Sequence, residues 1–300
     1  MSGFATALAH DAWLAFNERK WGVRAERVTY PEPGGPLDVV LYLDRRDRVV
    51  LPRLNPYLPV KYEQRPSVPY RATRAWTGAA GAMADDLRRR GLGSTIAFQS
   101  TITDLRPLAW RGFRIGVSYT LTQDLPIPDA NIDPDVRRRV RRATENGYRC
   151  ERTDRFADVL ACVTETEERQ RFRYALTASD LELLGSTMGD AFRAYVCYSA
   201  AGRPVAAQIL LHQDGGQAID WVNGTARDEL ASGATQLLTK FSLADVLGAG
   251  AVSIDWEGAN IPSVSAFKER WGGQVEPWFT IEPLTFRNVA RWIYAQVRYR

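Results

Sequence analysis

Short apolar runs of strand length alternate along this chain with longer stretches in which apolar residues recur at helical spacing. The clearest unit in the first half is a β-hairpin at 38–51, where two apolar runs flank a polar turn at 44–47. The other elements expected in this half are a helix over 72–90, which ends at Gly91, Leu92 and Gly93, and strands over 94–98 and 113–121.

In the second half, a polar, proline-rich stretch at 124–133 is typical of a linker. Asp133 and Pro134 then provide the cap and first residue of a helix that ends before Gly147. The later elements expected are strands over 148–152, 194–199, 204–212, 217–222, 252–256 and 277–281, and helices over 155–169, 179–189, 231–247, 263–271 and 284–300.

Two local patterns of the first half recur in the second half, 157 and 155 residues further along the chain. The helix end and strand at 90–98 match those at 247–255, and the hairpin at 44–50 matches the one at 199–205. Glycines often end helices, so chance is the alternative explanation. The shared order of hairpin, long helix and strand predicts an α+β fold made of two similar units. We expect domains at 1–128 and 129–283, with the helix over 284–300 packing back on the first.

The amino-acid composition limits the kinds of ligand and catalytic site that we expect. Lys and Arg exceed Asp and Glu by 39 to 35, a mild net charge of +4 that suits an anionic ligand. Three scattered cysteines and two histidines show no metal-ligand spacing, so we expect no metal site, no Cys-His or Ser-His nucleophile and a reducing compartment. No phosphate loop, signal peptide or membrane-spanning run is present, and a cytoplasmic protein is expected.

The densest cluster of candidate chemistry lies at 255–273. A predicted strand ends at Glu257, a loop with Gly258 follows, and a short helix then carries Phe267 and Lys268. Polar groups at the carboxyl end of a strand are well placed to contact a ligand. Taken alone, the pattern fits a capped loop with a surface lysine equally well.

This segment resembles the closing motif of the FemABX-type peptidoglycan aminoacyl transferases and their acetyltransferase relatives. That motif joins an acidic residue and a glycine to a Phe-Lys pair and a final Gly-Gly, here Asp255, Gly258, Phe267, Lys268, Gly272 and Gly273. The stretches 137–147, 202–211 and 218–224 resemble other family segments. The resemblance covers about 133–281 well and the first half weakly. It implies two tandem GNAT-like domains, each a central, mostly antiparallel sheet flanked by helices.

The family performs acyl transfer to an amine, and the resemblance implies that Lys268 stabilises the oxyanion of the reaction. Most of the other candidates have a plain alternative as surface charge or, for the tryptophans, as core. The candidates for substrate binding are Asp104, Arg106, Arg169, Arg173, Tyr174, Trp221, Asn223, Trp256, Glu257, Asn260 and Phe267, and those for contact with phosphates or tRNA are Arg138, Arg141 and Arg142.

The donor stays open at this point. GNAT-type enzymes that use acetyl-CoA carry an Arg or Gln and small residues at a helix start, where this chain has Leu230 and Thr235. We expect aminoacyl-tRNA or an acyl-CoA as donor substrate, no tightly bound cofactor, and an amine of a cell-wall precursor or small molecule as acceptor. The alternatives are an acyl-CoA-dependent N-acetyltransferase of polysaccharide or envelope metabolism and an inactive GNAT-like module that binds an anionic ligand.

Overall fold

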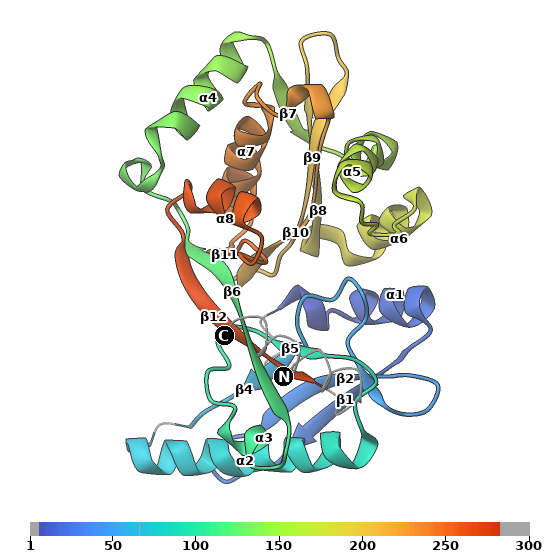
Figure 1. Ribbon diagram of the computed structural model, residues 1–300, viewed down its shortest axis with the longest axis vertical. Helices are drawn as coiled ribbons and strands as arrows, with labels where there is room; N and C mark the ends of the chain where they lie inside the picture. The colour runs from blue at the N-terminus through green and yellow to red at the C-terminus, as the bar shows by residue number, and fades with distance from the viewer. Residues whose placement is uncertain (1–5, 66, 283–300) are drawn as a thin grey trace, which may run out of the picture. The chain divides into compact units, whose positions relative to one another are not determined.

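The computed structural model describes residues 6–65 and 67–282 and divides the chain into two compact units (Figure 1). Unit 1 holds the residues up to Phe16 together with Tyr119–Glu276, and unit 2 holds Asn17–Ser118 and the residues from Pro277 onward. The sequence places the division at 128/129, whereas the contacts place it at 118/119. The chain changes unit within one continuous strand, β6 (Arg114–Asp124), because this strand is longer than its apolar run indicates. The helix expected over 284–300 lies outside the described residues.

Unit 1 is built on a mostly antiparallel sheet. Its strands follow the order β6, β11, β10, β9, β8, β7, and only β10 and β11 run parallel to each other. The predicted meander is confirmed as three neighbouring strands. The bounds are β7 Arg149–Arg152, β8 Phe192–Tyr198, β9 Pro204–Leu211, β10 Gln217–Thr225 and β11 Ser253–Asp255.

Helices cover both faces of this sheet. Figure 1 shows α4 (Pro134–Glu145) and α7 (Ala234–Gly248) along one face, and α5 (Phe156–Gln170) and α6 (Ala178–Met188) along the other. The predicted cap of α4 is present, since the Asp133 carboxylate accepts a hydrogen bond from the Asp135 amide at 2.7 Å. The remaining elements are α8 (Pro262–Glu269) and the 3-10 helices Ala7–Ala9, Asp129–Asn131, Gly189–Ala191 and Arg227–Glu229.

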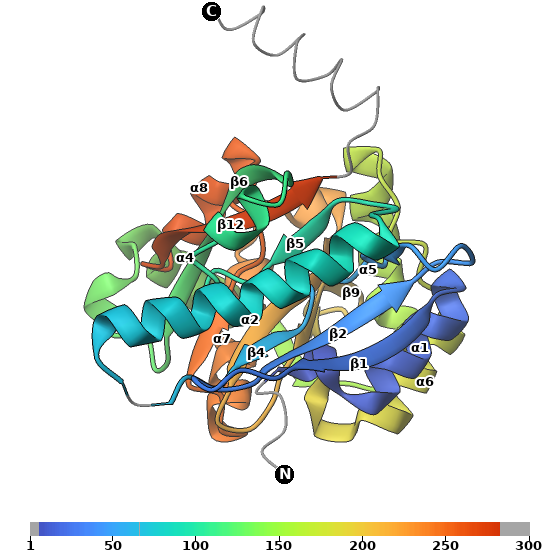
Figure 2. The same ribbon diagram turned by 90° about the horizontal axis from the view of Figure 1, so that it is seen from below.

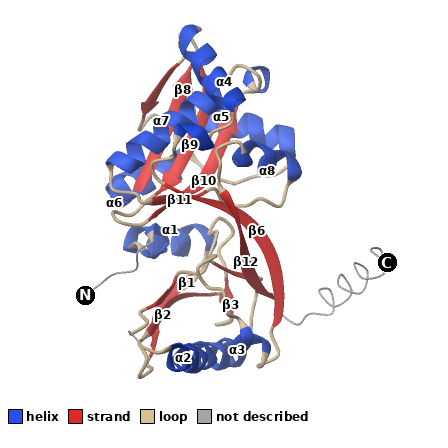
Figure 3. Ribbon diagram, turned by 90° about the vertical axis from the view of Figure 1, so that its left-hand side faces the viewer, coloured by secondary structure: helices blue, strands red, loops and turns tan. Residues whose placement is uncertain are grey.

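Unit 2 packs a long helix against a small antiparallel sheet. Figures 2 and 3 both show α2 (Pro69–Arg90) lying along this sheet. Apolar residues of the helix, such as Met83 and Leu87, form a core with strand residues such as Val39 and Leu41. The strands of this sheet are β1 Arg24–Tyr30, β2 Leu37–Leu43, β3 Val49–Val50 and β4 Val60–Tyr62. Strand β5 (Ile96–Phe98) lies outside it and pairs with the unit 2 part of β12 (Gln274–Glu282).

Two elements near the N-terminus escape prediction from the sequence. Helix α1 (Asp11–Trp21) has a weak apolar stripe, and β1 is mostly polar, so neither shows a clear period. Helix α3 (Arg106–Ala109) is a single turn after β5. The α+β class with mostly antiparallel strands flanked by helices is confirmed. Among the described residues, no helix is both long and apolar enough to cross a bilayer.

Candidate functional site

The site of interest lies in unit 1, where two parallel strands separate. β10 and β11 pair only over three residues each, 217–219 with 253–255. β10 then continues beside β9 as far as Thr225, while the chain after Asp255 turns toward β6, and the Trp256 amide donates to the Leu121 carbonyl at 2.9 Å. Side chains of β10 and of the turn at 255–258 therefore meet where the two strands part.

A bulge in β10 decides which polar groups gather there. The register with β9 shifts between Asp220 and Val222, so Asp220 and Asn223 come to the same face although they are three residues apart. The Asp220 carboxylate accepts hydrogen bonds from Gln208 Nε2 at 2.8 Å and from Asn223 Nδ2 at 2.9 Å. Gln208 in turn accepts from the Ser242 hydroxyl of α7 at 2.6 Å. Burial raises the pKa of Asp220, and the charge of Lys268 opposes that rise.

The turn after β11 is fixed through its amide groups. Asp255 Oδ1 accepts hydrogen bonds from the Glu257 amide at 2.9 Å and from the Thr120 hydroxyl at 2.6 Å. The Gly258 amide donates to the same hydroxyl group at 3.3 Å. The acidic residue of the resembling motif, Asp255, therefore shapes the backbone, and its side chain is only 1% exposed.

Lys268 fixes the same turn through its carbonyl groups. Its side chain reaches inward from the end of α8, and its Nζ donates to the carbonyl oxygens of Trp256, Glu257 and Gly258, the last at 3.2 Å. The residue is 7% exposed. A buried ammonium needs such acceptors, because an unpaired charge in the interior is costly. The alternative interpretation of Lys268 as a surface lysine is therefore wrong, because the residue is a buried cation that closes a turn.

Glu257 is the residue that this fixed turn presents. Its φ angle is 46°, a left-handed conformation that costs a non-glycine residue about 1 kcal/mol or more. Its carboxylate is half-buried and accepts no hydrogen bond from any described residue. Burial raises its pKa to about 8, the charge of Lys268 opposes the rise, and the charges of Asp255 and Asp220 add to it. A carboxyl group with a pKa in this range can exchange protons near neutral pH.

Tyr174 belongs to the same cluster. Its pKa is raised by burial first and by the charges of Glu257 and Asp220 next, while the backbone of Asn223 opposes the rise. The predicted residues that the structure brings together are therefore Lys268, Glu257, Asn223 and Tyr174. Strongly shifted carboxyl and hydroxyl groups around one lysine are typical of a reactive site.

The two predicted cleft tryptophans lie in the core. Trp221 is the bulge residue of β10 and packs edge-on against Trp13, with ring centroids 5.1 Å apart. Trp256 is fully buried and stacks on Trp271 at 6.0 Å. The burial of both rings supports the core alternative and not the predicted contact with substrate. Trp221 lies in β10, on the packed side of the sheet, and Trp256 follows β11, beneath the turn.

Other predicted residues have structural partners. The Asn260 side chain hydrogen-bonds the backbone of β6 as a neighbouring strand would. It accepts from the Tyr119 amide at 2.9 Å and donates to the Tyr119 carbonyl at 3.1 Å. Arg169 donates to the Thr225 carbonyl at 2.9 Å. Phe267 packs beside the core of unit 1, and Arg173 is exposed.

Two predicted acceptor contacts belong to unit 2. Asp104 pairs with Arg106, whose Nε and Nη2 lie 2.9 and 2.8 Å from its carboxylate oxygens. The hydrogen bond from Arg106 holds the pKa of Asp104 below its usual range. The two charges therefore compensate each other locally.

On α4, Arg138 pairs with Asp135, and Arg141 and Arg142 are exposed on the same helix. Their side chains face outward because Val136 and Ala143 occupy the buried stripe, as the helical spacing predicts.

Sequence reasoning missed Asp220, Gln208 and Ser242. The available signal is that Gln208 and Asp220 interrupt otherwise apolar strands, where an uncompensated polar group is disfavoured. Within 6–65 and 67–282, no group of three or more His, Cys, Asp or Glu side chains is arranged to hold a metal ion.

The start of α7 is closed. Gly233 and Ala234 are buried, and a Cβ on Gly233 would lie only 2.4 Å from the Arg139 carbonyl oxygen of α4. The Ala234 amide donates to the Ser232 hydroxyl at 3.1 Å. A helix start covered by another helix differs from the open backbone cradle that binds a pyrophosphate.

Comparisons with known proteins find similarity in structure only. No family model and no curated protein matches the sequence. The crystal structure of FemX matches with a TM-score of 0.62 at 13% identity, covering 90% of both chains. The C-terminal domain of a putative lysylphosphatidylglycerol synthetase from Agrobacterium fabrum matches with a TM-score of 0.60 at 13% identity, covering 90% of this chain and 88% of that one.

L-PGS from Bacillus licheniformis matches with a TM-score of 0.55 at 12% identity, over 94% of this chain and 95% of that one. At such identities the likeness concerns the fold, and it extends over most of each solved chain. The resemblance to FemABX-type proteins seen in the sequence is confirmed at this level. This chain has the fold that FemX and the lysylphosphatidylglycerol synthetase domains share.

Proposed function

We propose that this protein transfers an acyl or aminoacyl group to the nitrogen of an amine acceptor. One observation carries the proposal: in a FemX-like fold, a fixed turn presents the half-buried carboxylate of Glu257 beside the buried ammonium of Lys268. A lysylphosphatidylglycerol synthetase is by its name a protein that handles a lysyl group, which supports aminoacyl chemistry for this fold.

The chemistry begins with a proton. The acceptor ammonium must lose one proton, because only the neutral amine has a lone pair for attack. Glu257 takes that proton. The amine nitrogen then bonds to the donor carbonyl carbon, and the carbonyl oxygen becomes an oxyanion. Collapse of this intermediate breaks the bond to the leaving oxygen or sulfur, which receives the second proton of the amine.

Lys268 acts on this reaction by its charge. Its Nζ hydrogens point at carbonyl oxygens of the turn, so the oxyanion is stabilised by the nearby positive potential and not by a direct hydrogen bond. The same ammonium keeps the pKa of Glu257 from rising further. Lys268 is thus the proposed electrostatic centre of the site, and Glu257 the proposed general base.

The remaining candidates orient the substrates. Tyr174 and Asn223 are proposed to contact the acceptor amine beside Glu257. The exposed Arg173 is proposed to contact a more distant part of the acceptor. The substrate-binding role expected of Asp104 and Arg106 stays a prediction. We propose an amine of a cell-wall precursor or of a small molecule as acceptor, and the cytoplasm as location.

Aminoacyl-tRNA is the donor we favour. The buried start of α7 argues against a pyrophosphate cradle for an acyl-CoA at that place. The exposed arginines of α4, among them Arg138, Arg141 and Arg142, suit phosphates of a nucleic acid backbone. An acyl-CoA donor is the second candidate and requires a different binding place for its phosphates.

The test compares donors and variants. The full chain is incubated with tRNA charged with labelled amino acids or with labelled acetyl-CoA, and with a panel of amines, and the amide product is measured by mass spectrometry. Transfer from charged tRNA is expected, with a loss of about 100-fold or more in Glu257→Gln. Glu269→Gln is the matched control, because Glu269 is an exposed acid of α8 bonded to Ser265, and it should keep full activity.

Product from acetyl-CoA alone would replace the favoured donor with the second candidate. Absence of product with every donor and amine, combined with salt-dependent binding of tRNA, would identify an inactive anion-binding module. Equal rates for the wild type and Glu257→Gln would remove Glu257 from its role while leaving the transfer reaction in place.

A further inference from the structure

A groove with a cavity volume of 490 Å³ lies in unit 2 beside the β2–β3 hairpin. Its charged lining is unbalanced, with four arginines against one aspartate: Arg45, Arg46, Arg48, Arg53 and Asp44. Its apolar wall includes Trp21, Val23, Val50 and Leu51. None of these residues belongs to the candidate transfer site of unit 1.

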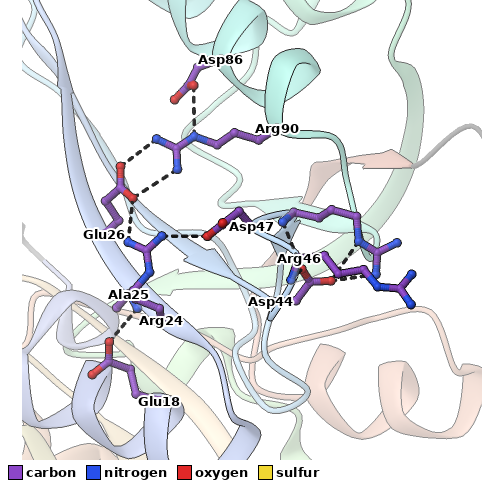
Figure 4. Close-up of polar contacts among 10 residues, drawn as sticks. Glu18, Arg24, Ala25, Glu26, Asp44, Arg46, Asp47, Asp86 and Arg90 are labelled. Atoms are coloured by element: carbon purple, nitrogen blue, oxygen red, sulfur yellow. Dashed lines mark hydrogen bonds and ion pairs between the residues drawn. The ribbon is translucent and has the colours of Figure 1, made fainter.

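The hairpin turn is held by its aspartate. Asp44 Oδ1 accepts from the amides of Arg46 and Arg48 at 2.8 and 3.0 Å. Asp44 Oδ2 accepts from Nη2 and Nε of Arg48 at 2.7 and 3.0 Å (Figure 4). The aspartate in the groove is therefore already paired with Arg48.

The neighbouring acids are occupied elsewhere. Figure 4 shows a chain of contacts in which Asp47 pairs with Arg24, and Arg24 and Arg90 both reach Glu26. Arg90 also contacts Asp86 of α2 at 3.1 Å. The acidic side chains Asp47, Glu26 and Asp86 near the hairpin therefore already have arginine partners.

Arg45 and Arg46 take no part in this ion-pair network. Both are exposed, and neither forms an ion pair with any residue in the described part of the chain. Two neighbouring arginines of the turn thus carry positive charges that lack a counter-charge among the described residues, and a bound anion would supply one.

The glycines that end α2 lie against the hairpin, next to the groove residue Ser94. The Val49 amide donates to the Gly91 carbonyl at 2.9 Å, and the Gly93 amide donates to the Val49 carbonyl at 2.8 Å. A Cβ on Gly93 would lie 2.7 Å from Val50 Cγ1 and 3.1 Å from Asp44 Oδ2. The Gly91 to Gly93 segment, which the sequence marks as a repeated feature, therefore lets the helix end approach the hairpin and shape the groove.

We infer that this groove binds a small molecule with a phosphate or diphosphate group and an aromatic or apolar body. The guanidinium groups of Arg45 and Arg46 match phosphate oxygens in geometry and charge. The body lies against the half-buried ring of Trp21 and the side chain of Val50. A volume of 490 Å³ suits a ligand of nucleotide size, and the apolar wall gives the body of such a ligand a surface to pack against. The inference stands apart from the transfer reaction.

Calorimetric titration of the full chain with ADP, inorganic pyrophosphate and adenosine tests this inference. ADP should bind most tightly, pyrophosphate more weakly, and adenosine not measurably. The double variant Arg45→Ala, Arg46→Ala should weaken ADP binding by about tenfold or more. The control Arg74→Ala, Arg88→Ala removes the same charge from exposed arginines of α2 outside the groove and should bind ADP like the wild type.

Thermal unfolding verifies that both double variants fold, which exposed side chains should permit. ADP that fails to bind the wild type at millimolar concentration would overturn the inference, as would equal affinities of the two double variants. A single-stranded oligonucleotide that binds through Arg45 and Arg46, while ADP and pyrophosphate do not, would assign the surface to nucleic acid instead.

Discussion

Lys268 donates a hydrogen bond to the backbone carbonyl of Glu257, and its charge also acts on the carboxylate of that same residue. One ammonium group thus fixes the backbone of the turn and opposes the effect of burial on the acid. The backbone of Glu257 is held in a left-handed conformation, while its carboxylate accepts no hydrogen bond within the described residues. Structure and reactivity are coupled at this pair.

Replacement of Lys268 by methionine should destabilise the protein. The carbonyl oxygens of Trp256, Glu257 and Gly258 lose their shared donor, and leaving buried acceptors unpaired costs about 3 kcal/mol in the free energy of unfolding. Urea denaturation measures the change. Lys240→Met, at an exposed position of α7, is the control and should cost less than about 0.5 kcal/mol. Similar small effects of both replacements would contradict the buried role of Lys268.

The pKa of Glu257 predicts how stability depends on pH. Its folded pKa of about 8 lies above the usual value of 4.5, so the folded protein retains a proton that the unfolded chain has lost. The contribution of Glu257 to the free energy of unfolding is therefore complete below pH 4.5 and is lost as the pH rises through 8. Glu257→Gln removes this loss, so the variant should gain stability over the wild type between pH 5 and pH 9. Parallel urea-denaturation series would contradict the raised pKa.

Asp220→Asn should shift the pH dependence of transfer. The charge of Asp220 raises the pKa of Glu257, and asparagine removes that charge while its oxygen still accepts from Gln208 and Asn223. The midpoint of the rate against pH should move to lower pH, and the free energy of unfolding should stay within about 1 kcal/mol. Asp228→Asn, at an exposed acid paired with Arg203, should leave the midpoint unchanged.

Trp256→Ala tests whether this ring belongs to the core. Removal of a fully buried tryptophan that stacks on Trp271 should cost about 3–5 kcal/mol of unfolding free energy. Trp110→Ala, at a position that is 63% exposed, should cost far less. If Trp256→Ala is no more destabilising than Trp110→Ala and mainly weakens substrate binding, the ring lines a cleft and the core assignment is wrong.

Local patterns in the sequence determined most elements and the fold class. The cap at Asp133 sets the start of α4, and the alternation of apolar runs and turns sets the meander, because capping and periodicity act over a few residues. The same patterns missed β1, because its residues are mostly polar and form a strand only through pairing with β2. The motif at 255–273 also indicated Lys268 and Glu257 as candidates.

Only the tertiary structure decided how those candidates meet. The bulge in β10 sends Trp221 to the core and Asp220 toward Asn223, and no local pattern encodes that extra residue. The burial of Lys268 beneath the turn depends on where α8 packs after β10 and β11 part. Contacts between residues far apart in the chain arise from strand pairing and packing, so the sequence alone supplied the residues of the site and the fold supplied their arrangement.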